Sequence, residues 1–218
     1  MAGLAAASVM PMSRRLPPAP RPATESAAVG QVRIIGGQWR NTRLAVPQRP
    51  GLRPTSDRVR ETLFNWLQPQ LPGARVLDLF AGSGALGLEA LSRGAAAATL
   101  IERDPALAAA IKATATRLGA AATVVNGDAL AWLANPASCR YDIAFVDPPF
   151  ADGLWDAVLA RLPGHLAGNA WLYIESDQAQ APAPGAGWQL HREGSTRQVR
   201  YALYRRQGAA TLATDSTL

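Results

Sequence analysis

The chain has 218 residues, 48% of them hydrophobic, which suffices for one substantial core with a smaller appendage. No apolar run reaches the roughly 20 residues that a membrane-spanning helix requires. The single thiol, Cys139, excludes a disulfide framework and a cysteine zinc site. These features are typical of a reducing compartment, and we expect a cytoplasmic protein.

The net charge of +6 is unevenly distributed along the chain. Residues 1–70 contain ten arginines and three acidic residues, whereas residues 71–218 contain twelve basic and thirteen acidic residues. A GC-rich genome would explain why Lys112 is the only lysine, but it would not explain the scarcity of acids before residue 70. The distribution favours a nucleic-acid partner for the N-terminal third, because guanidinium groups bind phosphates and base edges.

The two ends of the chain lack any apolar period. Residues 1–29 are rich in Ala, Pro and Arg, and we expect them and residues 207–218 to form disordered tails. Arg14 and Arg15 follow the mildly apolar N-terminal stretch instead of preceding it, which argues against a secretory signal peptide.

A short hairpin and a helix are predicted next. Val32–Ile35 and Arg43–Val46 are strand-like runs separated by a glycine pair and a polar turn. Thr55 or Ser56 can cap a helix that ends near Pro69. Three apolar residues fall on one face of that helix: Val59, Leu63 and Leu67.

Strand and helix patterns then alternate. Strands are predicted at 76–80, 98–101, 123–125, 143–146 and 171–174, and helices at 85–92, 105–118, 129–133 and 154–162. This alternation indicates a parallel sheet wound on both faces. Gln189–His191 and Gln198–Tyr204 have no helix between them and predict a closing antiparallel hairpin. We therefore expect an α/β, Rossmann-like doubly wound domain over residues 71–206, preceded by a basic, nucleic-acid-binding hairpin and helix over residues 30–70.

A glycine-rich loop follows the first predicted strand of this domain. The segment from Asp78 to Gly87 contains Gly82, Gly84 and Gly87 in the spacing G-x-G-x-x-G. Such a loop lets a ligand approach the backbone and the N-terminus of the next helix. The pattern alone would also fit a nicotinamide dehydrogenase or a tight turn without a ligand.

Three acids near the predicted strand ends bear on that interpretation. Asp78 stands four residues before the first loop glycine, where a carboxylate repels a pyrophosphate but can hold the ammonium group of S-adenosylmethionine. Glu102 ends the second strand, where it could bind ribose hydroxyls of either cofactor type or be a solvated strand-end charge. Asp128, with Ala129 beside it, follows the third strand. It could accept from an adenine amino group, cap the next helix, or do both.

The sequence Asp147-Pro148-Pro149-Phe150 directly follows the fourth strand. Two prolines hold the backbone extended and remove two amide donors, so the Asp147 side chain and the Pro148 carbonyl can both accept. An exocyclic NH2 group donates two hydrogen bonds and matches that pair, and Phe150 can stack on a base. The alternative is a proline turn without function.

These residues require little acid–base chemistry, because a sulfonium is already an activated methyl donor. Hydrogen bonds to Asp147 and Pro148 would orient the amine nitrogen for in-line attack, on a base that is unstacked or flipped. We expect no metal, since His165 and His191 lack metal-ligand spacing, and we interpret both as surface histidines.

Two N-terminal blocks add a family resemblance. Residues 33–40 (Arg-Ile-Ile-Gly-Gly-Gln-Trp-Arg) and 53–67 (Arg-Pro-Thr-Ser-Asp-Arg-Val-Arg-Glu-Thr-Leu-Phe-Asn-Trp-Leu), with the glycine loop and Asp-Pro-Pro-Phe, resemble the bacterial 16S ribosomal RNA guanine-N2 methyltransferases of the RsmD type. The resemblance runs from about Gln31 to Arg206. It implies a class I methyltransferase fold and a guanine substrate in 16S rRNA of the 30S subunit or its assembly intermediate. We also expect a monomer.

The resemblance assigns roles by motif. Catalytic and base-contacting residues would be Asp147, Pro148, Pro149 and Phe150. S-adenosylmethionine would contact Asp78, Phe80, Gly82, Gly84, Glu102, Asp128 and Ala129. RNA contacts would come from Arg33, Trp39, Arg40, Arg43, Arg53 and Arg58, although some of these arginines could instead brace the helix against the catalytic domain.

Three other functions remain to be weighed. An adenine-N6 methyltransferase would share Asp-Pro-Pro-Phe, but the predicted tail leaves only about 45 residues before the catalytic unit, too few for a DNA target-recognition domain. Asp78 and the proline pair argue against an oxidoreductase. An intact glycine loop and Asp147 argue against an RNA-binding assembly factor with an inactive site.

Overall fold

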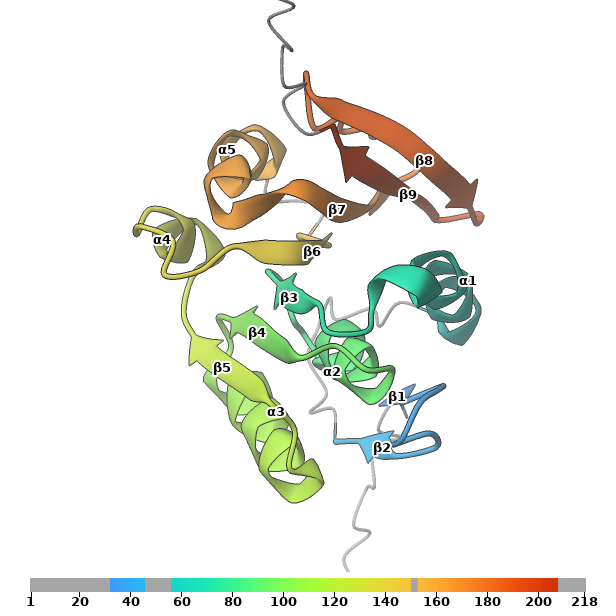
Figure 1. The fold of residues 1–218 in the computed structure, drawn as a ribbon, viewed down its shortest axis with the longest axis vertical. Helices are drawn as coiled ribbons and strands as arrows, with labels where there is room; N and C mark the ends of the chain where they lie inside the picture. Colours follow the sequence, from blue (N-terminus) through green and yellow to red (C-terminus); the bar gives the residue numbers. More distant parts are fainter. Residues whose placement is uncertain (1–31, 46–55, 150–152, 208–218) are drawn as a thin grey trace, which may run out of the picture.

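The computed structural model describes residues 32–45, 56–149 and 153–207. A seven-stranded sheet runs through it in the order β5-β4-β3-β6-β7-β9-β8 (Figure 1). Its strands are β3 (Arg75–Asp78), β4 (Ala97–Glu102), β5 (Ala122–Asn126), β6 (Tyr141–Val146), β7 (Leu166–Asp177), β8 (Trp188–Ser195) and β9 (Val199–Arg206). The first five of these are parallel, and β9 runs antiparallel between β7 and β8. The predicted doubly wound sheet and closing hairpin are confirmed.

Helices cover both faces of the sheet. They are α1 (Asp57–Leu67), α2 (Ala85–Ser92), α3 (Pro105–Leu118), α4 (Ala129–Leu133) and α5 (Trp155–Arg161), with short 3-10 turns η1 (Gln68–Gln70) and η3 (Leu162–His165). Residues of α1, α2 and α3 share one buried cluster with alternate residues of the strands. Residues of α4, α5 and η3 share a second cluster with the opposite face. This division into two apolar layers is what a buried parallel sheet requires.

Local signals explain the helix boundaries. Ser56 caps α1 by accepting from the Val59 amide, as predicted. Asp104 caps α3, whose first residue is Pro105, and Gly119 ends that helix in the left-handed conformation. Both predicted helices 105–118 and 129–133 have the observed bounds.

The N-terminal hairpin is shorter than predicted, because only β1 (Val32–Arg33) and β2 (Arg43–Leu44) pair. Val32, Ile34 and Leu44 are nevertheless buried in the cluster that also contains α1 and α2. The hairpin and helix therefore pack on the catalytic unit through the same apolar layer. Of the predicted tails over 1–29 and 207–218, only Gln207 is described, and its amide donates to the Gly187 carbonyl at 2.8 Å. Thr55 and Val46 also lie outside the described residues.

In the part of the chain that the structure describes, no helix is long and apolar enough to cross a membrane.

Candidate active site

The carboxyl ends of β3 and β6 are adjacent at the centre of the sheet, where the strand order reverses direction. In open α/β sheets this switch point is where ligands bind. The loop after β3 crosses it, held by hydrogen bonds from the Leu79 amide to the Phe145 carbonyl (3.1 Å) and from the Ala81 amide to the Ile101 carbonyl (2.9 Å). The glycine loop and the Asp147 motif thus lie at neighbouring strand ends.

The loop glycines are required by conformation and by packing. Gly82 and Gly84 have φ values of 53° and 73°, which disfavour residues with a side chain. A Cβ at Gly87 would lie 2.7 Å from Leu100 Cδ2, so glycine allows α2 to approach β4 closely. Glycine is therefore required in this loop by the backbone conformation and by the packing of α2 on β4.

Asp78 ends β3 and is 2% exposed. Its Oδ2 accepts a hydrogen bond from the Gly87 amide at 2.9 Å. Burial, opposed by the Gly87 hydrogen bond and assisted by the Glu102 charge, raises the pKa of Asp78 to about 7. Near neutral pH, binding of a cationic ligand can therefore shift this carboxyl to its ionised form.

Glu102 is buried at the end of β4, so it is not a solvated strand-end charge. Its Oε2 accepts from the Gly82 amide and its Oε1 from the Asp104 amide, both at 2.7 Å. One carboxylate thereby joins the glycine loop to the start of α3. A hydroxyl-bearing ligand at this edge would contact a carboxylate whose orientation is already fixed.

Asp128 is the N-cap of α4, and its Oδ1 accepts from the Ala131 amide at 2.8 Å. The capping role is therefore confirmed. The side chain is exposed, whereas Ala129 is buried beside it. Contact of either residue with an adenine stays a prediction.

The strand ends together fit S-adenosylmethionine by their chemistry. Three acids stand at the carboxyl ends of neighbouring strands: Asp78 on β3, Glu102 on β4 and Asp128 after β5. They offer acceptors to ammonium, hydroxyl and amino groups. A pyrophosphate placed on the same edge would face carboxylates instead of donors. Phe80 is half-buried in the loop and can supply an apolar contact.

Asp147 follows β6 and is half-buried, with Pro148 buried and Pro149 exposed. Burial raises the pKa of Asp147 well above its ordinary value, and the charges of Glu175 and Asp78 raise it further. Phe150 lies outside the described residues. Titratable groups with raised pKa values at a switch point are typical of functional sites. A role of this motif in holding a base stays a prediction.

The sequence analysis missed two buried residues on β7. Glu175 is 5% exposed, and its Oε2 accepts from the Tyr173 hydroxyl at 2.7 Å. The charge of Glu175 acts on Asp147 across the sheet. The available signal was an acid that directly follows four apolar residues at the end of a predicted strand.

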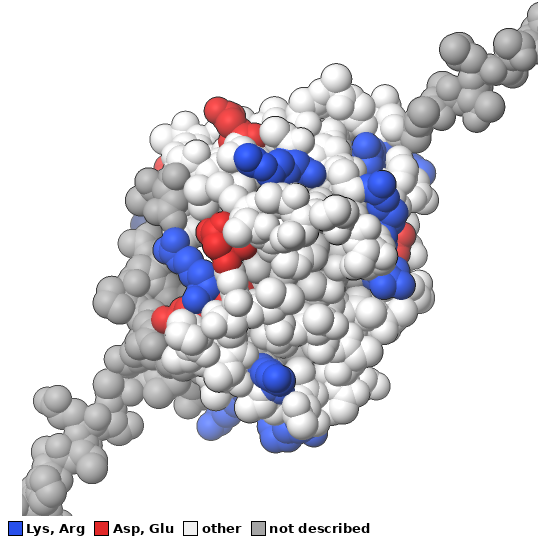
Figure 2. Space-filling model, turned by 90° about the vertical axis from the view of Figure 1, so that its left-hand side faces the viewer, with Lys and Arg blue, Asp and Glu red and all other residues white. Residues whose placement is uncertain are grey.

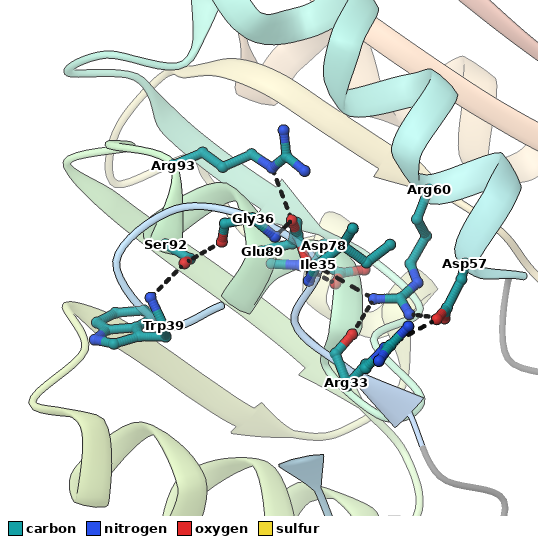
Figure 3. Close-up of polar contacts among 11 residues, drawn as sticks. Arg33, Ile35, Gly36, Trp39, Asp57, Arg60, Asp78, Glu89, Ser92 and Arg93 are labelled. Carbon is teal, nitrogen blue, oxygen red and sulfur yellow. Dashed lines mark hydrogen bonds and ion pairs between the residues drawn. The ribbon is translucent and has the colours of Figure 1, made fainter. Parts of the chain in front are cut away.

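A second polar cluster joins the N-terminal segment to α2 (Figure 3). Glu89, fully buried on α2, accepts from the amides of Ile35 (2.6 Å) and Gly36 (2.8 Å) and from Arg93 Nε (2.7 Å). Its Oε2 also lies 3.9 Å from NH1 of Arg60, which is buried and donates to the Arg33 carbonyl at 2.8 Å. We call Glu89, Arg60, Arg93 and the two amides the α2 junction.

Ser92 extends the α2 junction by one turn. Its hydroxyl donates to the Gly36 carbonyl at 2.6 Å and accepts from the Trp39 amide at 2.9 Å (Figure 3). Gly37 has a φ of 76° and passes so close to α2 that a Cβ there would overlap the Ser92 carbonyl. The segment 35–39 is thus fixed on the helix that begins at the glycine loop.

The predicted RNA contacts divide into two groups. Arg33 pairs with Asp57 at 3.3 Å and Trp39 packs against the core, so both help to hold the N-terminal segment. Arg40, Arg43 and Arg58 are exposed, and Arg53 lies outside the described residues. Figure 2 shows the side of the molecule that lies on the left in Figure 1, where basic and acidic side chains are dispersed among uncharged ones.

One histidine prediction is wrong. His165 is 4% exposed, its Nε2 lies 3.1 Å from the Leu133 carbonyl oxygen, and its ring packs against Trp132. The apolar residues of η3 and α4 enclose it, which a lone histidine between glycine and leucine does not reveal in the sequence. His191 is exposed, as predicted.

The sheet order and the acids at its carboxyl edge define a class I methyltransferase. Residues 32–205 match the family described as Conserved hypothetical protein 95, and the chain belongs to this family. The resemblance seen in the sequence is thereby confirmed.

Named relatives agree with this assignment. The chain is 54% identical over 182 residues to Ribosomal RNA small subunit methyltransferase D of Escherichia coli (strain K12), covering 82% of this chain and 91% of the relative. It is 41% identical to the Haemophilus influenzae protein of the same name, with coverages of 81% and 95%. The solved structure of Escherichia coli yhhF superimposes with a TM-score of 0.74 at 51% identity, covering 82% of this chain and 99% of that one.

Proposed function

We propose that this protein transfers a methyl group from S-adenosylmethionine to the exocyclic N2 of a guanine in 16S rRNA. The single observation that carries the proposal is the pairing of the glycine loop and Asp147-Pro148 at one switch point, in a chain 54% identical to a ribosomal RNA small subunit methyltransferase. Such an enzyme would act in the cytoplasm, where rRNA is assembled, and as a monomer.

The acids at the strand ends would hold the cofactor. Asp78 would bind its ammonium group, Glu102 its ribose hydroxyls and Asp128 its adenine, while Gly82 and Gly84 let the ligand approach the loop backbone. When bound, the cofactor supplies an electrophilic methyl group on a sulfonium. The protein therefore needs to place the acceptor nitrogen, and it needs no strong acid or base.

Asp147 and the Pro148 carbonyl would hold that nitrogen. Two acceptors fix both N–H bonds of the amine, and this orients the lone pair of the nitrogen toward the methyl donor. The raised pKa of Asp147 makes its carboxylate a stronger acceptor, and it can take up the proton that the amine releases. Pro149 keeps the motif extended, and Phe150 would stack on the flipped base.

The N-terminal segment would bring the RNA to this edge. Arg40 and Arg43 are exposed on the segment that packs against α1 and α2, and Arg58 is exposed on α1 itself. Arg53 belongs to the same basic stretch of the sequence. Arg33 and Trp39 would add contacts from the part of the segment that the α2 junction and Asp57 hold. The substrate we favour is a small-subunit particle, whose folded RNA presents one guanine.

The test uses 30S particles, and separately naked 16S rRNA, from a strain that lacks the protein. Each is incubated with the full chain and labelled S-adenosylmethionine, and the RNA is digested to nucleosides for chromatography and mass spectrometry. We expect one N2-methylguanosine per particle and less on naked RNA. N6-methyladenosine as the product would overturn the guanine assignment, and binding of NAD instead of S-adenosylmethionine would overturn the cofactor assignment.

A further inference from the structure

Glu175 lies level with Asp147 on the neighbouring strand. The register of β6 and β7 pairs Val146 with Ile174, so the next residues, Asp147 and Glu175, are side by side. One pleat earlier, Phe145 and Tyr173 meet on one face of the sheet with ring centroids 6.2 Å apart. Because side chains alternate along strands, Asp147 and Glu175 leave the sheet on that same face.

The surroundings of Glu175 hold it in one orientation. The Tyr173 hydroxyl donates to Glu175 Oε2 at 2.7 Å, and both side chains are buried. Burial and the Glu175 charge raise the pKa of Tyr173 well above its ordinary value, so the phenol stays protonated and donates. On the neighbouring strand, Tyr201 of β9 lies opposite Glu175 of β7. Its ring stacks on that of Trp66 of α1, with the ring centroids 5.6 Å apart.

The purine bases differ at the atom beside the exocyclic amine. Guanine presents N1–H next to its N2 amine, which makes two neighbouring donor groups. Adenine presents an N1 lone pair next to its N6 amine, which makes an acceptor and a donor. If Asp147 and Pro148 hold the amine, the next position along the Watson–Crick edge contacts the next side chain of the site.

We propose that Glu175 is that side chain, accepts a hydrogen bond from guanine N1–H, and thereby selects guanine over adenine. Tyr173 acts through Glu175 as a positioning residue. The proposal rests on the proposed function, because it assumes that Asp147 and Pro148 hold the exocyclic amine. A carboxylate facing adenine N1 would meet a lone pair, whereas guanine brings N–H groups to both acids.

The closeness of the two acids agrees with this role. Two carboxylates side by side repel each other, and the charge of Glu175 contributes to the raised pKa of Asp147. A guanine edge places positively polarised hydrogens in front of both groups, which relieves the repulsion. An adenine edge supplies hydrogens to Asp147 only. The site is therefore complementary to a base with adjacent donors.

The test replaces guanine with 2-aminopurine, which keeps the C2 amine but has a lone pair at N1. The modified guanine is first mapped in the product, and particles are reassembled with either base at that position. For the unaltered protein, we expect kcat/KM to be at least about 10²-fold lower with 2-aminopurine, because a site built to bind an N–H rejects an analogue that lacks it.

In Glu175→Gln the amide can turn its NH2 toward N1 of 2-aminopurine. We expect the guanine to 2-aminopurine ratio to fall at least tenfold, through better use of 2-aminopurine together with poorer use of guanine. Tyr173→Phe, which keeps the carboxylate but frees it to move, should lower the ratio by a smaller factor. The exposed acid Glu193, paired with Arg200 on the closing hairpin, provides the control Glu193→Gln, whose ratio should equal that of the unaltered protein.

Equal use of both bases by the unaltered protein would overturn the proposal, and this measurement needs no variant. An unchanged ratio in a folded Glu175→Gln would also overturn it, even if overall activity fell, because that would indicate a structural role. Folding is checked by melting temperature and by the dissociation constant for S-adenosylmethionine. N6-methyladenosine as the original product would overturn the proposed function, which distinguishes the two failures.

Discussion

The molecule buries carboxylates in two regions and compensates their charge in different ways. At the α2 junction, Glu89 is surrounded by donors: Arg93 Nε, the amides of Ile35 and Gly36, and the guanidinium of Arg60. At the carboxyl edge, Asp78 and Asp147 lie near other acids, and the pKa of each is raised. The compensated carboxylate joins two parts of the chain, whereas the acids at the edge are suited to receive donors from a ligand.

Helix α2 takes part in both regions. The Gly87 amide in its first turn donates to Asp78, and Glu89 and Ser92, two and five residues further along, hold residues 35–39. Residues 35–39 of the N-terminal segment and the cofactor loop are therefore joined through one short helix. Substitutions in the two regions should have different consequences: loss of stability at the junction, and loss of binding or turnover at the edge.

The largest effect is expected for Glu89→Ala. The change leaves Arg60 and Arg93 in a buried site without their carboxylate, and breaking such a pair costs about 3–5 kcal/mol of unfolding free energy. Chemical denaturation with and without the substitution measures it. The control Glu193→Ala removes an exposed pair and should cost about 0–1 kcal/mol. Equal losses in the two variants would refute the distinction between the regions.

Asp147→Ala tests the other region. Removing one of two acceptors lets the amine rotate away from the methyl donor, so turnover should fall by a factor of roughly 10² or more. Asp147→Asn should keep part of the activity, because its amide oxygen still accepts. The dissociation constant for S-adenosylmethionine, measured by calorimetry, should stay nearly constant. Full turnover in Asp147→Ala would show that the motif does not hold the base.

The same contrast separates what the sequence could predict from what it could not. The helices over 105–118 and 129–133 were predicted to the residue, because their caps Asp104 and Asp128 and the terminal Gly119 act locally. The glycine loop and Asp147 were placed together by topology, since the carboxyl ends of parallel strands meet at one edge.

The α2 junction could not be predicted in this way. Arg60 and Glu89 stand in helical patterns where charged residues are normally solvated, and their partners are far away in the sequence. β7 was predicted only at 171–174, because the polar and glycine residues that extend it from Leu166 have weak strand propensity. Glu175 was missed with it, since its burial depends on Tyr173 and on the pairing with β9.

Asp78 gives the edge a pH dependence. Its pKa in the folded, ligand-free protein is about 7, above the ordinary 3.8, so the native state holds a proton that the unfolded state loses first. Stability without ligand should therefore fall as pH rises from about 4 to about 7. Binding an ammonium group requires the ionised form, so cofactor affinity should increase up to tenfold per pH unit below about 7.

Calorimetry between pH 5.5 and 8.5, with Asp78→Asn as the comparison, checks this expectation. The amide can still accept from the Gly87 amide, so the fold should be retained. Affinity in the variant should be lower and nearly independent of pH. A pH dependence identical to that of the unaltered protein would assign the titration to another group.

The smallest effect is expected where the N-terminal segment meets the RNA. Arg40 is exposed on the segment that the α2 junction fixes, so Arg40→Ala should leave stability and cofactor affinity unchanged. RNA affinity should decrease several-fold, and the slope of log K against log salt should become shallower by about 0.7 to 0.9, as for one lost phosphate contact.

The matched control is Arg161→Ala, since Arg161 is an exposed arginine of α5 on the other face of the sheet. If the control loses as much affinity as Arg40→Ala, binding depends on overall charge rather than on the N-terminal segment. If only Arg40→Ala changes the slope, the junction holds an RNA-binding element in register with the site that methylates the base.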